Sequence, residues 1–327
     1  MGKDVVSAET PSVGKKAKAL FLEYGIYVIM LLMILFFTFK NSNFLTINNI
    51  LLILRTSSVL GITCVGMFFV LIVAGIDISV SMNMYFSAVI GSIILNNLGL
   101  PLWLSFVAAT LSGALIGIIN GFFVAYVKIV PFIVTLATYS VAKGLALLFT
   151  DQKMVFLDSK VMTIANAKFL GVSAFVYIFL AIVIIAHTIL TRTQFGRQIY
   201  AVGNNLVAAN KMGINGARTV FMAYVICGAL SGFAGELSSC NLGVINANFA
   251  QGDEFVVISS CVIGGASLFG GKGRVLPGAI IGICLVQAII NGMTMMGASA
   301  YVYTIFRGVI IFIAVMIDSI KFSGEIR

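Results

Sequence analysis

Charged residues are scarce in this chain, and their scarcity excludes most kinds of soluble protein. Asp, Glu, Lys and Arg make up 9% of the 327 residues, whereas hydrophobic residues make up 60%. Because charges are almost absent from the long apolar runs, the chain has no room for a soluble domain of ordinary size. The net charge of +9 is not that of a nucleic-acid binder, which would cluster its basic residues on a soluble surface. We therefore expect one membrane domain, surrounded by lipid and without a nucleic-acid partner.

Catalytic and metal-binding groups are also scarce. The chain has one histidine, His187, near the end of an apolar run, and five cysteines, none of them in a C-x-x-C pair. The cysteines are expected to be small buried residues. Paired carboxylates, a nucleophile beside a base and clustered metal ligands are all missing from the sequence pattern. We expect no catalytic residue, no metal and no cofactor.

The segment Gly264–Gly273 (GGASLFGGKG) superficially suggests a phosphate-binding loop. It fails the template, because Ala266 stands where the first glycine belongs and Gly273 follows the lysine where a hydroxyl is needed. If ATP drives this protein, another chain must therefore bind and hydrolyse it.

Long apolar runs are what the chain does have. About 20 apolar residues span a hydrocarbon core about 30 Å thick, and such runs form helices because lipid satisfies no backbone polar group. A β-barrel would show shorter alternating segments. The sequence predicts an all-α polytopic membrane protein of about ten transmembrane helices, the third and eighth of them short: Leu20–Phe39, Ile50–Gly75, Tyr85–Leu98, Leu102–Val127, Pro131–Thr150, Gly171–Leu190, Val220–Cys240, Phe255–Phe269, Val275–Met293 and Tyr301–Ile317.

The distribution of Lys and Arg predicts the orientation of these spans. With the N-terminus in the cytosol, 13 of the 20 basic residues fall in cytosolic segments and four in external ones. We expect a cytosolic tail over 1–19, a membrane domain over 20–318 and a second cytosolic tail over 319–327. Residues 191–219 would face the cytosol, and residues 151–170 would face outside.

The polar stretch Thr191–Thr219 interrupts the apolar pattern. Its asparagines could cap a short helix, and the run Gly213–Gly216 could end one. Ala208 and Ala209 lie between them, and small side chains let another protein approach closely. The alternatives are an ordinary surface turn and a docking helix for a cytosolic partner, of which we favour the docking helix.

Four segments, in order, resemble one family. Residues 193–205 (TQFGRQIYAVGNN), with the alanines and glycine that follow, closely resemble the coupling segment of ribose-type ABC importer permeases. Residues 66–81 (GMFFVLIVAGIDISVS), 131–138 (PFIVTLAT) and 262–273 (VIGGASLFGGKG) resemble three further motifs of that family. The resemblance extends from about Asn43 to Asp318.

The resemblance implies the fold and the partners of a permease subunit in the bacterial inner membrane. Two such subunits, identical or different, would line the pathway for a monosaccharide or a related small polar solute. ATP-binding-cassette subunits would hold the ATP and dock on the cytosolic loops, and an extracytoplasmic solute-binding protein would deliver the solute. The expected ATPase-coupling residues are Gly203, Asn204, Asn205, Ala208, Ala209, Gly213, Ile214 and Asn215.

Polar residues within or beside the spans are candidates for the pathway. An ionisable group at membrane depth is costly, so Asp77, just past the second span, is a functional candidate. We expect it to hydrogen-bond backbone or serine groups where that span breaks. Neutral residues could bind sugar hydroxyls or simply link helices: Asn120, Thr135, Tyr139, Gln287 and Asn291. Gly113, Gly117 and Gly121 form a stripe that favours close helix packing.

Two other functions remain open at this point. An ion-coupled secondary transporter would need buried acids or broken helices near mid-membrane, and Asp77 and the glycine-rich break at 264–273 fit this in part. A membrane-embedded enzyme would need the catalytic constellation that the sequence lacks.

Overall fold

The structure is a computed structural model that describes residues 28, 30–159 and 161–325. The predicted N-terminal tail and the start of the first predicted span lie outside the described residues, and the rest of that span contains the helix Met30–Lys40. The remaining helices are α2 (Ile47–Ile72), α3 (Val80–Ser92), the π-helical turn η1 (Ile93–Asn97), α4 (Leu102–Ala125), α5 (Pro131–Thr150), α6 (Val161–Ala165), α7 (Ala174–Arg192), α8 (Gln194–Asn204), α9 (Leu206–Lys211), α10 (Gly216–Leu242), α11 (Asp253–Ile263), α12 (Val275–Met295) and α13 (Ala300–Glu325).

The all-α fold is confirmed, because each predicted span from the second to the tenth coincides with a helix. Within the described residues, seven helices are long and apolar enough to cross a membrane: α2, α4, α5, α7, α10, α12 and α13. The third and eighth predicted spans correspond to α3 and α11, which have 13 and 11 residues. At about 1.5 Å per residue, helices of this length reach roughly halfway across the hydrocarbon core.

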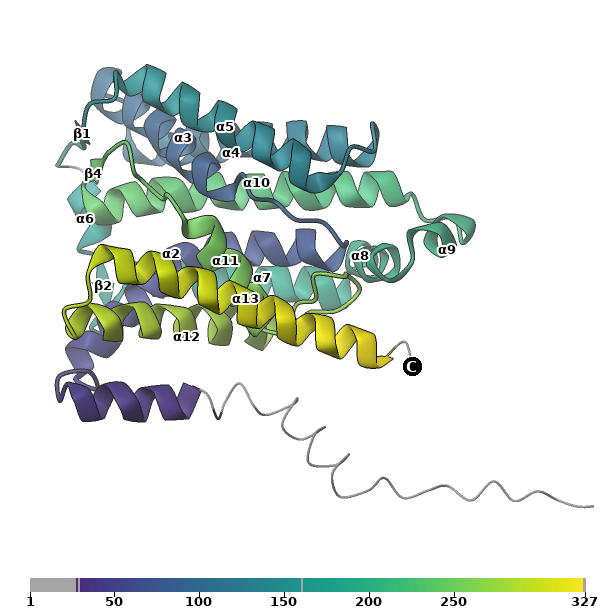
Figure 1. Cartoon of the computed structure of the whole chain (residues 1–327). Helices are drawn as coiled ribbons and strands as arrows, with labels where there is room; N and C mark the ends of the chain where they lie inside the picture. The colour runs from purple at the N-terminus through teal and green to yellow at the C-terminus, as the bar shows by residue number, and fades with distance from the viewer. Residues whose placement is uncertain (1–27, 29, 160, 326–327) are drawn as a thin grey trace, which may run out of the picture.

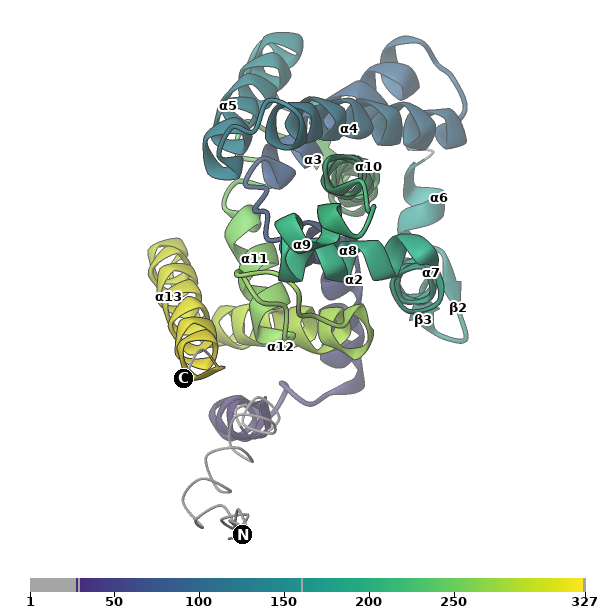
Figure 2. The same ribbon diagram turned by 90° about the vertical axis from the view of Figure 1, so that its right-hand side faces the viewer.

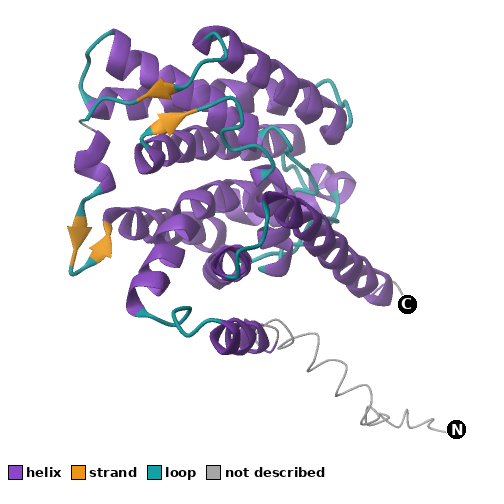
Figure 3. Ribbon diagram, turned by 60° about the vertical axis from the view of Figure 1, so that its left-hand side comes forward, coloured by secondary structure: helices purple, strands orange, loops and turns teal. Residues whose placement is uncertain are grey.

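The helices lie side by side, with different structures at the two ends of the bundle (Figure 1). One end carries two short antiparallel ribbons, β1 (Val155–Phe156) with β4 (Val244–Ile245) and β2 (Lys168–Phe169) with β3 (Val172–Ser173), seen as orange arrows in Figure 3. The other end carries α8 and α9, and α13 runs to this end as well. The segments 151–170 and 191–219, which were predicted on opposite sides of the membrane, therefore lie at opposite ends of the bundle.

Helix α2 forms the centre of the bundle (Figure 2). In its most apolar stretch 61% of the residues are buried, against 6% in α13. The run from Ser57 to Ile72 is buried throughout, and α7, α10, α11 and α12 pack around it. In the most apolar stretches of α4, α5 and α13 only 28%, 22% and 6% of the residues are buried, as is suitable for contact with lipid or with another membrane subunit.

The predicted glycine stripe on α4 is confirmed as a backbone contact with α10. A Cβ added at Gly113 would overlap the Gly228 carbonyl, and one added at Gly117 would overlap the Tyr224 carbonyl. On α10, Gly228 and Gly232 approach α4 equally closely. Such contacts between small residues replace the hydrophobic driving force that lipid-embedded helices lack.

The chain turns back on itself at two places. After α2, Ala74 adopts φ +61°, and the irregular segment 73–79 leads into α3, which runs toward the β1–β4 end. After α10, Gly243 (φ +70°) starts the return segment 243–252, and α11 runs from there toward the α8–α9 end. Irregular backbone at membrane depth is tolerated only where protein or a water-filled cavity covers it, and most of the residues in 73–79 are buried.

Candidate coupling surface and pathway residues

The polar segment 191–219 contains two short helices, α8 and α9, each of which begins at a side-chain cap. Thr193 begins α8 by accepting a hydrogen bond from the Gly196 amide at 3.2 Å. Asn205 begins α9 by accepting one from the Ala208 amide at 2.9 Å. Gly213, at φ +83°, follows the end of α9 and provides the left-handed conformation that glycine adopts most easily. The short helix that the sequence predicted is therefore present.

The segment has an inner and an outer face. On the inner face, Gly203 packs on the Ile72 carbonyl and the Gly271 amide, Ala209 is buried at 1% exposure, and Ile214 is half-buried. The other five predicted coupling residues are exposed: Asn204, Asn205, Ala208, Gly213 and Asn215.

The interpretation that both alanines leave room for a partner is corrected for Ala209, whose side chain packs inside this chain. Sequence reasoning also missed the apolar residues of the outer face. Val207 is 65% exposed and Met212 is 73% exposed, with Leu206 beside them. We call Leu206, Val207, Ala208, Lys211 and Met212 the docking face. The signal that could have identified it is the presence of three bulky apolar residues, Leu206, Val207 and Met212, beside the polar residues Asn205 and Asn210.

Asp77 lies in the break after α2, where it is 1% exposed. Its Oδ1 accepts hydrogen bonds from the Ser79 amide at 2.9 Å and the Ser79 hydroxyl at 2.6 Å. The Asn120 amide donates to Ser79 Oγ at 2.8 Å and lies 3.4 Å from both carboxylate oxygens. Thr138 Oγ1 donates to Asn120 Oδ1 at 2.7 Å. The expected bonding of Asp77 to backbone and serine is confirmed, and the network ties the break to α4 and α5.

The structure does not gather the remaining pathway candidates into the same network. Asn291 on α12 exchanges two hydrogen bonds with Asn49 on α2, at 2.9 and 3.0 Å. Thr135 is buried, and its hydroxyl donates to the Pro131 carbonyl of its own helix at 3.0 Å. Gln287 is 8% exposed on α12. Tyr139 on α5 is half-buried.

The start of α11 carries polar groups that sequence reasoning did not select. Arg307 on α13 lies 3.4 Å from Asp253 Oδ1 and donates to the Gln251 carbonyl at 3.2 Å. Glu254 is 4% exposed, and its Oε2 accepts no hydrogen bond from the described residues. Asp253 and Glu254 lie in the first turn of α11, where the helix dipole stabilises negative charge.

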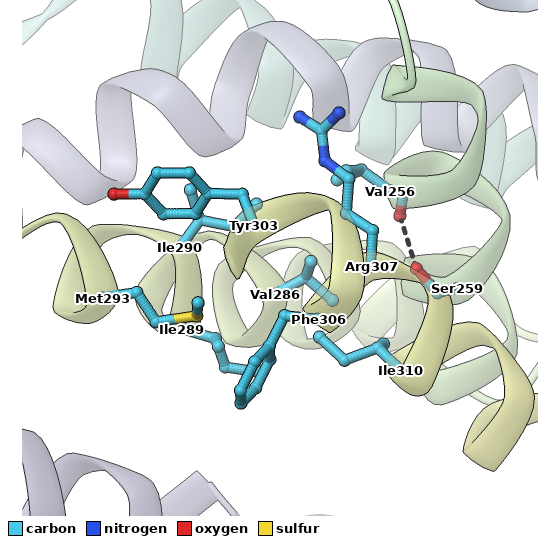
Figure 4. A pocket seen from close by; sticks show the side chains of 10 residues that line it. All are labelled: Val256, Ser259, Val286, Ile289, Ile290, Met293, Tyr303, Phe306, Arg307 and Ile310. Carbon is cyan, nitrogen blue, oxygen red and sulfur yellow. Dashed lines mark hydrogen bonds between the residues drawn. The ribbon is translucent and has the colours of Figure 1, made fainter. Parts of the chain in front are cut away.

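A small pocket lies between α11, α12 and α13 (Figure 4). In that view the Arg307 guanidinium points away from the apolar side chains of Ile289, Met293 and Phe306. The pocket holds about 10 Å³, which is about one water-sized sphere. It is therefore far too small for a monosaccharide.

This architecture, a helical membrane bundle with broken helices and a capped polar segment at one end, is that of a transport permease. The family model described as "Branched-chain amino acid transport system / permease component" matches residues 49–315. The chain belongs to this family, as a multi-pass permease of an ABC importer in the bacterial inner membrane, and its resemblance to the ribose type is confirmed.

Curated relatives agree over nearly the whole chain. The ribose import permease protein RbsC of Haemophilus influenzae is 32% identical over 303 residues, which cover 91% of this chain and 93% of the relative. The galactose/methyl galactoside import permease protein MglC of Escherichia coli is 31% identical, with 93% and 96% covered. The D-allose transport system permease protein AlsC of Escherichia coli is 32% identical, with 90% and 91% covered. No solved structure matches the chain.

Proposed function

We propose that this chain is the membrane subunit through which an ATP-driven importer brings a monosaccharide into the cell. The observation that carries the proposal is the docking face, which presents exposed apolar side chains on a capped helix at one end of the bundle. Relatives named for ribose, galactose and allose import support the sugar as solute. ATP is bound and hydrolysed by separate subunits, because the glycine-rich segment of this chain lacks the phosphate-loop template.

Three partners complete the proposed importer. ATP-binding-cassette subunits dock on α8 and α9. A second permease subunit, identical or different, lines the pathway together with this chain. A solute-binding protein delivers the sugar to the end that carries the β1–β4 and β2–β3 ribbons.

Reconstituted uptake tests the proposal directly. The complex is placed in liposomes and supplied with radiolabelled D-ribose, D-galactose or D-allose. Uptake should require both ATP and the solute-binding protein. If this chain alone takes up sugar on a proton or sodium gradient, the alternative of an ion-coupled secondary transporter replaces the importer.

Cysteine labelling tests the orientation of the bundle. Four of the five native cysteines are buried and the fifth is half-buried, so background labelling should be low. Ser159→Cys, at an exposed site before α6, should react with an impermeant maleimide added outside cells. Met212→Cys should react only after the membrane is opened, and Met212 is preferred to Asn205 because Asn205 caps α9. The opposite pattern of labelling would invert the proposed topology.

A charge on the docking face should detach the ATPase subunits. Val207→Glu places a carboxylate in the centre of the proposed apolar contact with the ATPase subunit. Substitution of a central interface residue typically lowers the free energy of binding by about 2 kcal/mol or more. We expect co-purification of the ATPase and sugar uptake both to fall at least about tenfold, while the yield of folded permease is unchanged.

The matched control for Val207→Glu is Met154→Glu, which is 64% exposed at the opposite end of the bundle and should leave ATPase binding intact. Changes at Ala209 or Gly213 are poorer probes, because Ala209 is buried and Gly213 has φ +83°. If Val207→Glu binds ATPase and transports as the wild type does, α9 is not the docking element.

A further inference from the structure

The glycine-rich segment 264–274 joins α11 to α12 and contacts α8 directly. The Tyr200 hydroxyl on α8 donates to the Gly273 carbonyl at 2.6 Å. Burial raises the pKa of the Tyr200 phenol, against the opposing effect of Arg274, so the hydroxyl keeps the proton that it donates. The segment is also tied to the end of α2, because the Gly271 amide donates to the Ile72 carbonyl at 2.8 Å.

Glycines bring the backbones of α8, the end of α2 and segment 264–274 into direct contact. A side chain at Gly203 of α8 would overlap the Ile72 carbonyl and lie 2.7 Å from the Gly271 nitrogen. A side chain at Gly270 would lie 2.6 Å from the Ala74 side chain and 2.8 Å from the Gly203 carbonyl. Because the backbones touch, a displacement of α8 toward the bundle must displace segment 264–274.

Helix α13 holds the same segment from another side. Asp318 Oδ2 accepts hydrogen bonds from the Leu268 amide at 2.8 Å and from the Ser267 hydroxyl at 3.2 Å. At the other end of α11, Arg307 of α13 binds the Gln251 carbonyl and Asp253. The half-length helix α11 is therefore held at both ends by polar side chains of α13.

The segment has room to move where it meets α11 and α12. An open pocket of about 310 Å³ lies beside it, lined by Ile263, Gly264, Gly265, Gly273, Arg274, Pro277, Gly278 and Ile281. Gly265 has φ +93°, with open space where a side chain would be. Interiors are otherwise close-packed and transmit displacement rather than absorb it.

We propose that segment 264–274 carries the movement of the ATPase-facing helices to α11 and α13, with Tyr200 and Asp318 as its positioning residues. The inference rests on the proposed function, since it assumes that ATPase subunits move α8 and α9. Tyr200 binds the segment from the ATPase side, and Asp318 binds it from the side of the membrane helices that respond. Segment 264–274, which does not match the phosphate-loop template, thereby has a mechanical role.

Loss of the Tyr200 hydroxyl should uncouple ATP hydrolysis from sugar transport. The full importer carrying Tyr200→Phe is reconstituted with its ATPase subunits and solute-binding protein, and sugar moved per ATP hydrolysed is measured with labelled D-ribose, D-galactose or D-allose. We expect this ratio to fall about threefold to tenfold, the factor that one net hydrogen bond represents, while the amount of assembled complex is unchanged.

The matched control is Tyr177→Phe, which removes a similar bond, Tyr177 hydroxyl to Phe169 carbonyl at 2.9 Å, at the opposite end of the bundle. It should keep the wild-type ratio. A purely structural role for Tyr200 would lower the yield of complex and leave the ratio of the surviving molecules unchanged, which would overturn the inference.

Asp318 provides the second, independent pair of variants. Asp318→Ala removes the acceptor for Leu268 and Ser267 and should lower the ratio as Tyr200→Phe does. Asp318→Asn keeps an acceptor oxygen, so its ratio of sugar moved to ATP hydrolysed should stay close to that of the wild type. If Tyr200→Phe and Asp318→Ala both transport at the wild-type ratio, segment 264–274 is not the link. A wild-type complex that moves no sugar contradicts the proposed function instead, so the two failures are distinguishable.

Discussion

Asp77→Leu is expected to prevent the bundle from assembling. The Asp77 carboxylate is the acceptor for the Ser79 amide and hydroxyl, and it lies within reach of the Asn120 amide. A leucine accepts no hydrogen bond, and each buried donor left without an acceptor costs about 1–3 kcal/mol. We expect the yield of monodisperse protein in detergent to collapse, and the thermal unfolding midpoint of any surviving protein to fall.

Asp77→Asn is the control, because asparagine keeps an acceptor oxygen for Ser79 and loses only the charge. It should assemble and retain most of its transport. A well-assembled Asn variant that transports no sugar would show that the charge itself is required. That result would favour proton coupling over a structural role for the break after α2.

Gly117→Leu is expected to separate α4 from α10. A side chain at Gly117 would overlap the Tyr224 carbonyl and lie 3.0 Å from the Val225 Cα. Backbone atoms cannot move aside as a flexible side chain can, so the cost should reach or exceed the upper end of the roughly 1–3 kcal/mol typical of overpacking. Size-exclusion profiles and unfolding midpoints measure the loss.

Gly144→Leu on α5 is the matched control for this substitution. An added Cβ at Gly144 meets no atom within 4 Å, and leucine favours the helix more than glycine does. The Gly144 variant should be at least as stable as the wild type. Equal stability of the two variants would refute the backbone contact between α4 and α10.

The sequence alone predicts the helices well, because a membrane helix satisfies its own backbone and therefore depends on local composition. It also locates α9, since Asn205 and Gly213 act on their own neighbours in the chain. Neither observation requires knowledge of the three-dimensional packing.

What sequence reasoning missed depends on contacts between distant segments. Ala208 and Ala209 are the same residue type, one exposed and one buried, and a six-residue helix has too few turns to reveal which alanine faces inward. The partner of Asn291 is Asn49, 242 residues away. The Asp77 network needs Asn120 and Thr138 from two later helices. Such pairings are set by helix packing, which no local pattern encodes.

The central position of α2 has a consequence for synthesis of the protein at the membrane. Its neighbours α7, α10, α11 and α12 all follow it in the chain, and α10 begins about 140 residues after α2 ends. At roughly 5–20 residues per second, the ribosome needs on the order of ten seconds or more to supply that helix. During this interval α2, with the polar residues Ser57, Ser58 and Thr63 that end up in the core, must lie against lipid or an insertion factor. The helix at the centre of the finished bundle is thus made well before the helices that bury it.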